Sequence, residues 1–328
     1  TATTYHFQEE YMETNTSFTE GKILKPLILF AFPVLLALFL QAMYGAVDLL
    51  IVGKFASSAD VSAVSTGSQI MTTLTNLISS FAMGTTILLG QQIGSGKKEE
   101  GGRTVGTAIV MFAAIAFLIA LFFLFKSYQH PKPAGYLFHT FTFIGTGSLL
   151  FPQLTYFAPI FWIGAYNFQS LHTKSFFASL VGWSLPYWFL LGYAYTSGQM
   201  DLFYRPFLEL VNFHPVRFNF QPWELATSGY LLLLYIVSSS HCLIAGYEDK
   251  IRTRSYLHFL IFLNFCIFAY IGLQPALYPH LLSLLLIGVS ILIGHLFVLT
   301  NSRSSNIFFI IMLVGLFTLF GFNLWTLL

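Results

Sequence analysis

The sequence has few charged residues for its length. Lys, Arg, Asp and Glu make up 9% of its 328 residues, whereas soluble domains carry about 25%. The shortage extends over nearly the whole chain, and the mean hydropathy is +0.72. The formal net charge is only +2, and the chain has no basic stretch within a soluble domain. We therefore expect no nucleic-acid partner. The composition predicts a multi-pass membrane protein whose main partner is the lipid bilayer.

Cysteine is also scarce. The chain has two, Cys242 and Cys266, each within an apolar helix candidate. Such thiols are more often packing residues than disulfide partners or metal ligands. We expect no metal site, no cofactor and no catalytic residue. The polar and acidic residues 1–22 are expected to form a cytoplasmic tail.

Apolar runs of membrane length recur along the chain. A membrane helix needs about 20 mostly apolar residues. We predict an all-α, polytopic membrane helical bundle with nine spans, within a range of eight to ten: 24–52, 60–92, 104–125, 136–168, 173–195, 226–246, 255–273, 277–299 and 305–327. The run 136–168 leaves two alternatives, because Pro152 and Pro159 interrupt it and could divide it into two short helices.

The distribution of Lys and Arg predicts the orientation, because these residues are enriched in cytoplasmic loops. A cytoplasmic N-terminus places SGKKEEGGR (95–103) inside as well. If 136–168 is one crossing, EDKIRTR (248–254) is also inside; if it is two, EDKIRTR is outside. We favour one crossing. The polar loop 196–225 then lies outside, as do Lys126 and Lys132.

The composition changes near residue 126. Residues 23–125 hold 11 aromatic residues in 103 positions, whereas residues 136–328 hold 43 in 193. The polar, proline-containing stretch 126–135 between them is typical of a linker. Two alternatives follow: one protein with uneven halves, or a junction between two unrelated membrane segments.

Asp48 is an isolated acid within an apolar run, since no other acid lies between Glu20 and Asp60. A carboxylate inside an apolar run usually faces a partner, a cavity or an ion path. Gln41, Tyr44, Gly45 and Asp48 follow one another at i, i+3, i+4 and i+7, so a helix places them on one face. The alternative is an acid that reaches the headgroups near Lys54.

The second predicted span carries polar residues at steps of three and four, which share a helix face: Ser62, Ser65, Gln69, Thr72, Thr73, Asn76, Ser79 and Ser80. Among them we expect Gln69, Thr73 and Asn76, with Gln41 and Tyr44, to line a cavity. Plain hydrogen bonding between helices is the alternative. The GSGK that follows lacks the spacing of a phosphate-binding loop and follows no strand, so we reject nucleotide binding.

Three motifs in order carry a family resemblance: LKPLILFAFPVLLALFLQAMYGAVDLLIVGKF (24–55), VSAVSTGSQIM (61–71) and GTTILLGQQIGSGKKEEGGRTVGTA (84–108). They resemble the start of the MATE (multidrug and toxin extrusion) transporters. The resemblance covers about 12–125. It implies an exporter of small organic cations or drugs in a bacterial inner membrane, driven by Na⁺ or H⁺ entry. Asp48 matches the acid that couples to the cation in that family.

The resemblance covers only three spans, whereas MATE transporters have twelve in two related halves. No second copy of these motifs follows. The sequence therefore predicts a partial or chimeric transporter, which could need a homo- or hetero-oligomeric partner. A non-transporting membrane scaffold or accessory protein is the alternative.

Residues 136–328 resemble an uncharacterised family of membrane proteins from Bacteroidota, and that resemblance implies no activity. A lipid-linked glycosyltransferase-like enzyme is a further alternative, since Asp201, Arg205 and Glu209 lie in the polar loop. Four histidines lie in or near different spans and could form a metal or haem pair, although interface histidines are commoner: His241, His258, His280 and His295.

Overall fold

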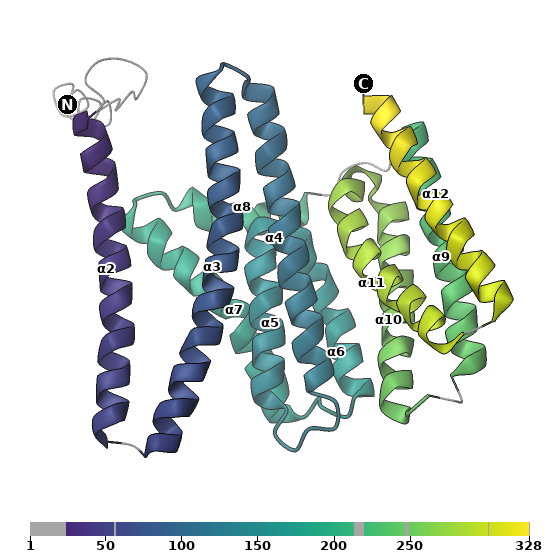
Figure 1. Cartoon of the computed structure of the whole chain (residues 1–328), viewed down its shortest axis with the longest axis horizontal. Coiled ribbons are helices and arrows are strands. Elements are labelled where there is room, and N and C mark those ends of the chain that lie inside the picture. Colours follow the sequence, from purple (N-terminus) through teal and green to yellow (C-terminus); the bar gives the residue numbers. More distant parts are fainter. Residues whose placement is uncertain (1–23, 56, 213–219, 247–248, 301, 328) are drawn as a thin grey trace. The chain divides into compact units, whose positions relative to one another are not determined.

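A computed structural model describes residues 24–55, 57–212, 220–246, 249–300 and 302–327. Throughout these ranges the regular structure is helical, with no strand, which confirms the predicted all-α class (Figure 1). The chain divides into two compact units, residues 1–105 and 106–328. The boundary lies inside helix α4 and not at the predicted linker 126–135, which stays a prediction from composition.

Unit 1 contains α2 (Leu24–Phe55), α3 (Ser58–Gly94) and the first turns of α4 (Lys98–Lys126). The helices α2 and α3 form an antiparallel hairpin (Figure 1). A tight turn joins α3 to α4, where Gly96 has a φ of 78°, a conformation that favours glycine. After it, Lys97 Nζ lies 3.0 Å from Glu100 Oε1.

Unit 2 is built around an aromatic core that includes the rest of α4. Phe117 of α4 is fully buried. Its ring packs edge-on against Phe157 at 6.0 Å and Phe161 at 5.6 Å between centroids. These partners belong to η1 (Pro152–Phe157) and α6 (Ala158–Asn167). The third helix of the MATE-like segment is therefore part of the core of the aromatic region.

The predicted single crossing at 136–168 is wrong. The run forms α5 (Ala134–Leu150), then η1 and α6, which fold back as a hairpin. Its two ends meet: Ser127 Oγ donates to Ser170 Oγ at 3.0 Å, and the Gln129 backbone N–H donates to the Phe168 carbonyl at 3.0 Å. Pro152 has no N–H to continue α5, which explains the break. The segment thus returns to the side on which it began.

The hairpin helix α5 packs closely on α7 (Thr173–Thr196) through two glycines. A Cβ on Gly145 would lie 2.5 Å from the Trp183 carbonyl oxygen, and a Cβ on Gly182 would clash with the Phe138 carbonyl. Small residues at such contacts let two backbones approach, as is common between membrane helices.

The remaining helices are α8 (Asp201–Val211), α9 (Pro222–Ala245), α10 (Ile251–Leu273), η2 (Pro275–Leu277), α11 (Tyr278–Leu299) and α12 (Arg303–Leu327). α11 packs against α9 and α10, and α12 packs against α9. Tyr230 of α9 donates a hydrogen bond to the Met312 carbonyl of α12 at 2.7 Å. The predicted loop 196–225 is partly wrong, because it contains α8.

Among the described residues, seven helices are long and apolar enough to cross a membrane. Of the nine predicted spans, seven meet this criterion of length and apolar composition. The two that do not meet it are the second, which forms the long but more polar helix α3, and the hairpin at 136–168. A multi-pass helical membrane protein is confirmed.

Candidate functional site

The first candidate site is the face of α2 that carries Asp48. Because α2 is one helix from Leu24 to Phe55, Gln41, Tyr44 and Asp48 share a face as expected. The Tyr44 side chain is 77% exposed. A Cβ on Gly45 would meet nothing within 4 Å. The side chains of Gln41 and Asp48 lie outside the described residues, so their roles stay predictions.

The polar face of α3 is the second part of this site. Gln69, Thr73 and Asn76 are all exposed. Thr73 Oγ1 donates to the Gln69 carbonyl at 2.9 Å, and Ser80 Oγ donates to the Asn76 carbonyl at 2.7 Å. These hydroxyls are thus hydrogen-bonded within their own helix. The exposed side-chain amides of Gln69 and Asn76 can each donate and accept. Facing lipid, such groups would be unfavourable, which favours a cavity or a protein partner.

A buried cluster in unit 2 was not predicted from the sequence. His295 Nε2 of α11 lies 3.1 Å and 3.2 Å from the two carboxylate oxygens of Asp249, in the connection between α9 and α10. The side chains are only 14% and 9% exposed. His295 Nδ1 also lies 3.7 Å from Cys242 Sγ. Asp249 precedes His295 by 46 residues, so no sequence motif signals the cluster. It ties the α9–α10 connection to α11.

Two of the four histidines have other partners in the structure. The His280 ring stacks on Phe151 at 4.9 Å between centroids, and His295 pairs with Asp249. In the described ranges, no group of three or more His, Cys, Asp or Glu side chains is arranged to hold a metal ion.

In the predicted outer loop, one acid pairs with an arginine and another caps a helix. Arg205 Nε donates to Glu209 Oε1 at 3.0 Å on the surface of α8. Glu224 accepts a hydrogen bond from the Gln221 backbone N–H at 2.9 Å and caps the start of α9. His214 and Arg217 lie outside the described residues. Arg205 and Glu209 thus form a surface pair, and Glu224 serves as a helix cap.

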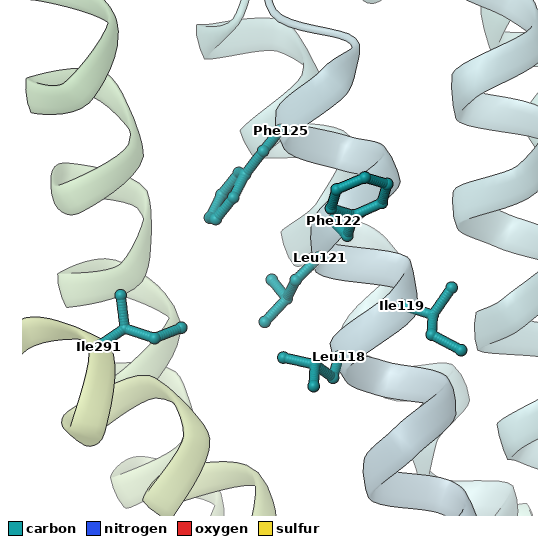
Figure 2. A pocket seen from close by; sticks show the side chains of 6 residues that line it. All are labelled: Leu118, Ile119, Leu121, Phe122, Phe125 and Ile291. Atoms are coloured by element: carbon teal, nitrogen blue, oxygen red, sulfur yellow. The ribbon is translucent and has the colours of Figure 1, made fainter. Parts of the chain in front are cut away.

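Unit 2 also has an apolar groove between α4 and α11. Figure 2 shows Leu118, Leu121 and Phe125 on α4 facing Ile291 of α11 across it. Its lining residues are all apolar, so a hydrocarbon chain fits this groove better than a polar ligand does.

Comparison with known proteins identifies the first part of the chain. Residues 33–131 match the family described as MatE. No curated protein matches the chain, and no solved structure does. The resemblance of residues 136–328 to a Bacteroidota family stays a prediction. The expected resemblance to the multidrug and toxin extrusion transporters is thus confirmed for the matched range, and residues 33–131, called the MatE segment below, are similar to that family.

Proposed function

We propose that this chain takes part in cation-coupled export of small organic cations. The observation that supports the proposal is the MatE match, which includes Asp48 and the whole polar face of α3. A carboxylate within an apolar segment is costly unless it is neutralised or paired. If a drug cation and Na⁺ or H⁺ exchange at Asp48, the carboxylate is paired or neutralised both when the drug is bound and when the coupling ion is bound.

The neighbouring polar residues would serve binding rather than chemistry. Tyr44 and Gln41 lie about one and two turns before Asp48, where their donors suit a charged carboxylate. Gln69 and Asn76 would provide polar groups from α3. No covalent step is required, so we infer a transporter and not an enzyme.

The proposal requires a partner chain. Alternating access needs two halves that move around a central site, and the MatE match supplies one part of one half. Among the described residues of α2, none in its most apolar stretch, within Ala31–Lys54, is buried. A second copy or another membrane protein would cover the polar faces of α2 and α3 and close the cavity.

The orientation of the chain in the membrane is also a proposal. Basic residues lie at both ends of α4, so the charges of this helix do not decide which end is cytoplasmic. Lys98 begins this helix and Lys126 ends it. The start of α10 lies beside the Lys126 end of α4: Tyr256 donates to the Phe125 carbonyl at 2.6 Å, and the Arg252 guanidinium lies 6.0 Å from the Tyr128 ring. Arg252 therefore adds positive charge to that end. The first helix usually dominates orientation. We therefore place the N-terminus in the cytoplasm of the inner membrane.

The transport proposal is tested by efflux of a cationic dye from a pump-deficient host that expresses the full chain. We expect efflux above the empty vector, loss of that efflux in Asp48→Asn, and retention in Asp60→Asn, an acid in the first turn of α3. Immunoblots of membrane fractions check that each variant is present. Efflux equal to the empty vector for the unmodified chain would exclude transport by this chain alone.

A membrane scaffold or accessory protein is the second candidate. It is supported by the burial of α4, whose Phe117, Leu121 and Leu124 lie in the core of unit 2. A transporter helix held this way has less freedom to move between two states. Absence of efflux both with and without a co-expressed membrane protein, with the chain still present in the membrane fraction, would favour this scaffold or accessory role over transport.

A further inference from the structure

A cleft beside α8 combines aliphatic walls with a pair of opposite charges. It has a volume of about 380 Å³, and α4, α5, η1, α7 and α8 all contribute to its lining. The walls include Leu149, Leu190 and Leu202, and the charged side chains are Arg205 and Glu209. A hydrocarbon chain fits the walls, whereas the charges call for a polar group at one end of the same ligand.

The helix α8 has the properties of a membrane-surface helix. Its 11 residues are too few to span a bilayer, which takes about 20. It is amphipathic, with Pro206 buried and Phe203 and Phe207 half-buried on its inner face. Leu208 on its outer face is 68% exposed. Such a helix lies at the level of the lipid headgroups, which puts the charged part of the cleft at that level.

The two charges of the cleft form a neutral pair that still has unused hydrogen-bonding capacity. Arg205 Nε and Glu209 Oε1 are 3.0 Å apart, and their side chains are 75% and 43% exposed. A guanidinium has five N–H donors, and a carboxylate has two acceptor oxygens. The pair can therefore donate to a phosphate through Arg205 and accept from an ammonium through Glu209 without separating.

We propose that this cleft binds a phospholipid with a zwitterionic, ammonium-bearing headgroup, of the phosphatidylethanolamine class. The acyl chain would lie against Leu149 and Leu190. A headgroup with only negative charge would face the Glu209 carboxylate, and a quaternary ammonium has no N–H to donate to it. The charge pair therefore selects a primary ammonium over both.

Two other clefts of unit 2 provide a comparison. The groove of Figure 2 has no charged lining residue. The cleft lined by Trp183, Tyr187 and Phe203, on α7 and α8, has none either. These two can hold lipid chains but cannot select a headgroup. Headgroup selection is therefore expected from the α8 cleft.

The test is native mass spectrometry of the full chain, released from nanodiscs with equal parts of phosphatidylethanolamine, phosphatidylcholine and phosphatidylglycerol. We expect bound phosphatidylethanolamine to be enriched over both other lipids. In the double variant R205Q/E209Q, that enrichment should fall about three- to tenfold, as for the net loss of one exposed hydrogen bond. The matched control is K97Q/E100Q, which removes another exposed pair at 3.0 Å in unit 1.

A second variant, Leu190→Trp, fills the cleft and leaves both charges in place. It should remove the selectively bound lipid, and it decides the question if R205Q/E209Q does not fold. Bound lipid in the same proportions as the nanodisc would overturn the proposal, and so would enrichment of phosphatidylglycerol or phosphatidylcholine. Enrichment that survives in R205Q/E209Q and in L190W would do the same. None of these outcomes depends on transport.

Discussion

His295 Nε2 lies 3.1 Å from a carboxylate oxygen of Asp249, and both side chains are almost completely buried. The pair joins α11 to the connection that follows α9, two parts of the chain that are far apart in sequence. Cys242 approaches the other ring nitrogen at 3.7 Å, so the imidazole has a polar neighbour on each side. A buried carboxylate that is hydrogen-bonded to an imidazole stabilises the fold only while both partners are present.

Removing the carboxylate should therefore destabilise unit 2. We expect Asp249→Ala to lower the free energy of unfolding by about 3 kcal/mol, because His295 loses its buried partner. Glu209→Ala, in the exposed pair with Arg205, should cost less than about 1 kcal/mol. Unfolding by SDS titration in micelles measures both. Equal losses in the two variants would show that burial does not strengthen the Asp249–His295 pair.

The close contact between α5 and α7 should depend on glycine. In Gly145→Ala the new Cβ would lie 2.5 Å from the Trp183 carbonyl oxygen, and forcing the helices apart should cost about 1–3 kcal/mol. Gly192 of α7, the partner helix, has nothing within 4 Å of an added Cβ. Gly192→Ala should therefore be neutral or slightly stabilising. Thermal unfolding of the two variants in the same detergent checks the difference.

The hairpin at 134–167 makes a prediction about membrane sidedness. Because Ser127 contacts Ser170, residues just before and just after the hairpin lie at the same side. Cysteines introduced at Lys132 and Lys174 should both react with an impermeant maleimide from one side of inverted or right-side-out vesicles. The unmodified chain supplies the background from its two native cysteines. Labelling of the two positions from opposite sides of the membrane would show instead that residues 136–168 cross it once.

The third helix of the MatE segment should contribute to the stability of unit 2. Phe117 is fully buried and Phe122 is 55% exposed on the same helix. We expect Phe117→Ala to cost about 3–5 kcal/mol through the cavity it leaves, with a much smaller effect of Phe122→Ala. Unfolding followed by the tryptophans reports on unit 2, since all five lie after residue 160. Similar small effects would indicate that α4 is not part of that core.

The exposed face of α2 should lie at a contact with another chain. Tyr44, which is 77% exposed, occupies that face beside Asp48. A photo-reactive residue in place of Tyr44 should cross-link in membranes to a second copy or to another membrane protein. The same group in place of Gln129, in the connection that precedes α5, serves as the control. A monomer at every expression level would contradict the need for a partner.

Several properties of this protein follow from the sequence by itself. Apolar runs of membrane length have few stable alternatives to helices in a bilayer, because every backbone polar group must be satisfied within the segment. The order and spacing of the motifs around Asp48 similarly led to the MatE relation, which the match at residues 33–131 confirms. Both inferences use information that is local in the chain.

Only the tertiary structure decided how the segments return and which distant residues meet. Pro152 indicated a break, but not whether the chain continues across the membrane; the contact of Ser127 with Ser170 decided that. Composition changed at residue 126, yet the packing of Phe117 places α4 in the core of unit 2. The Asp249–His295 pair likewise depends on contacts between separate helices, which periodicity along one helix cannot specify.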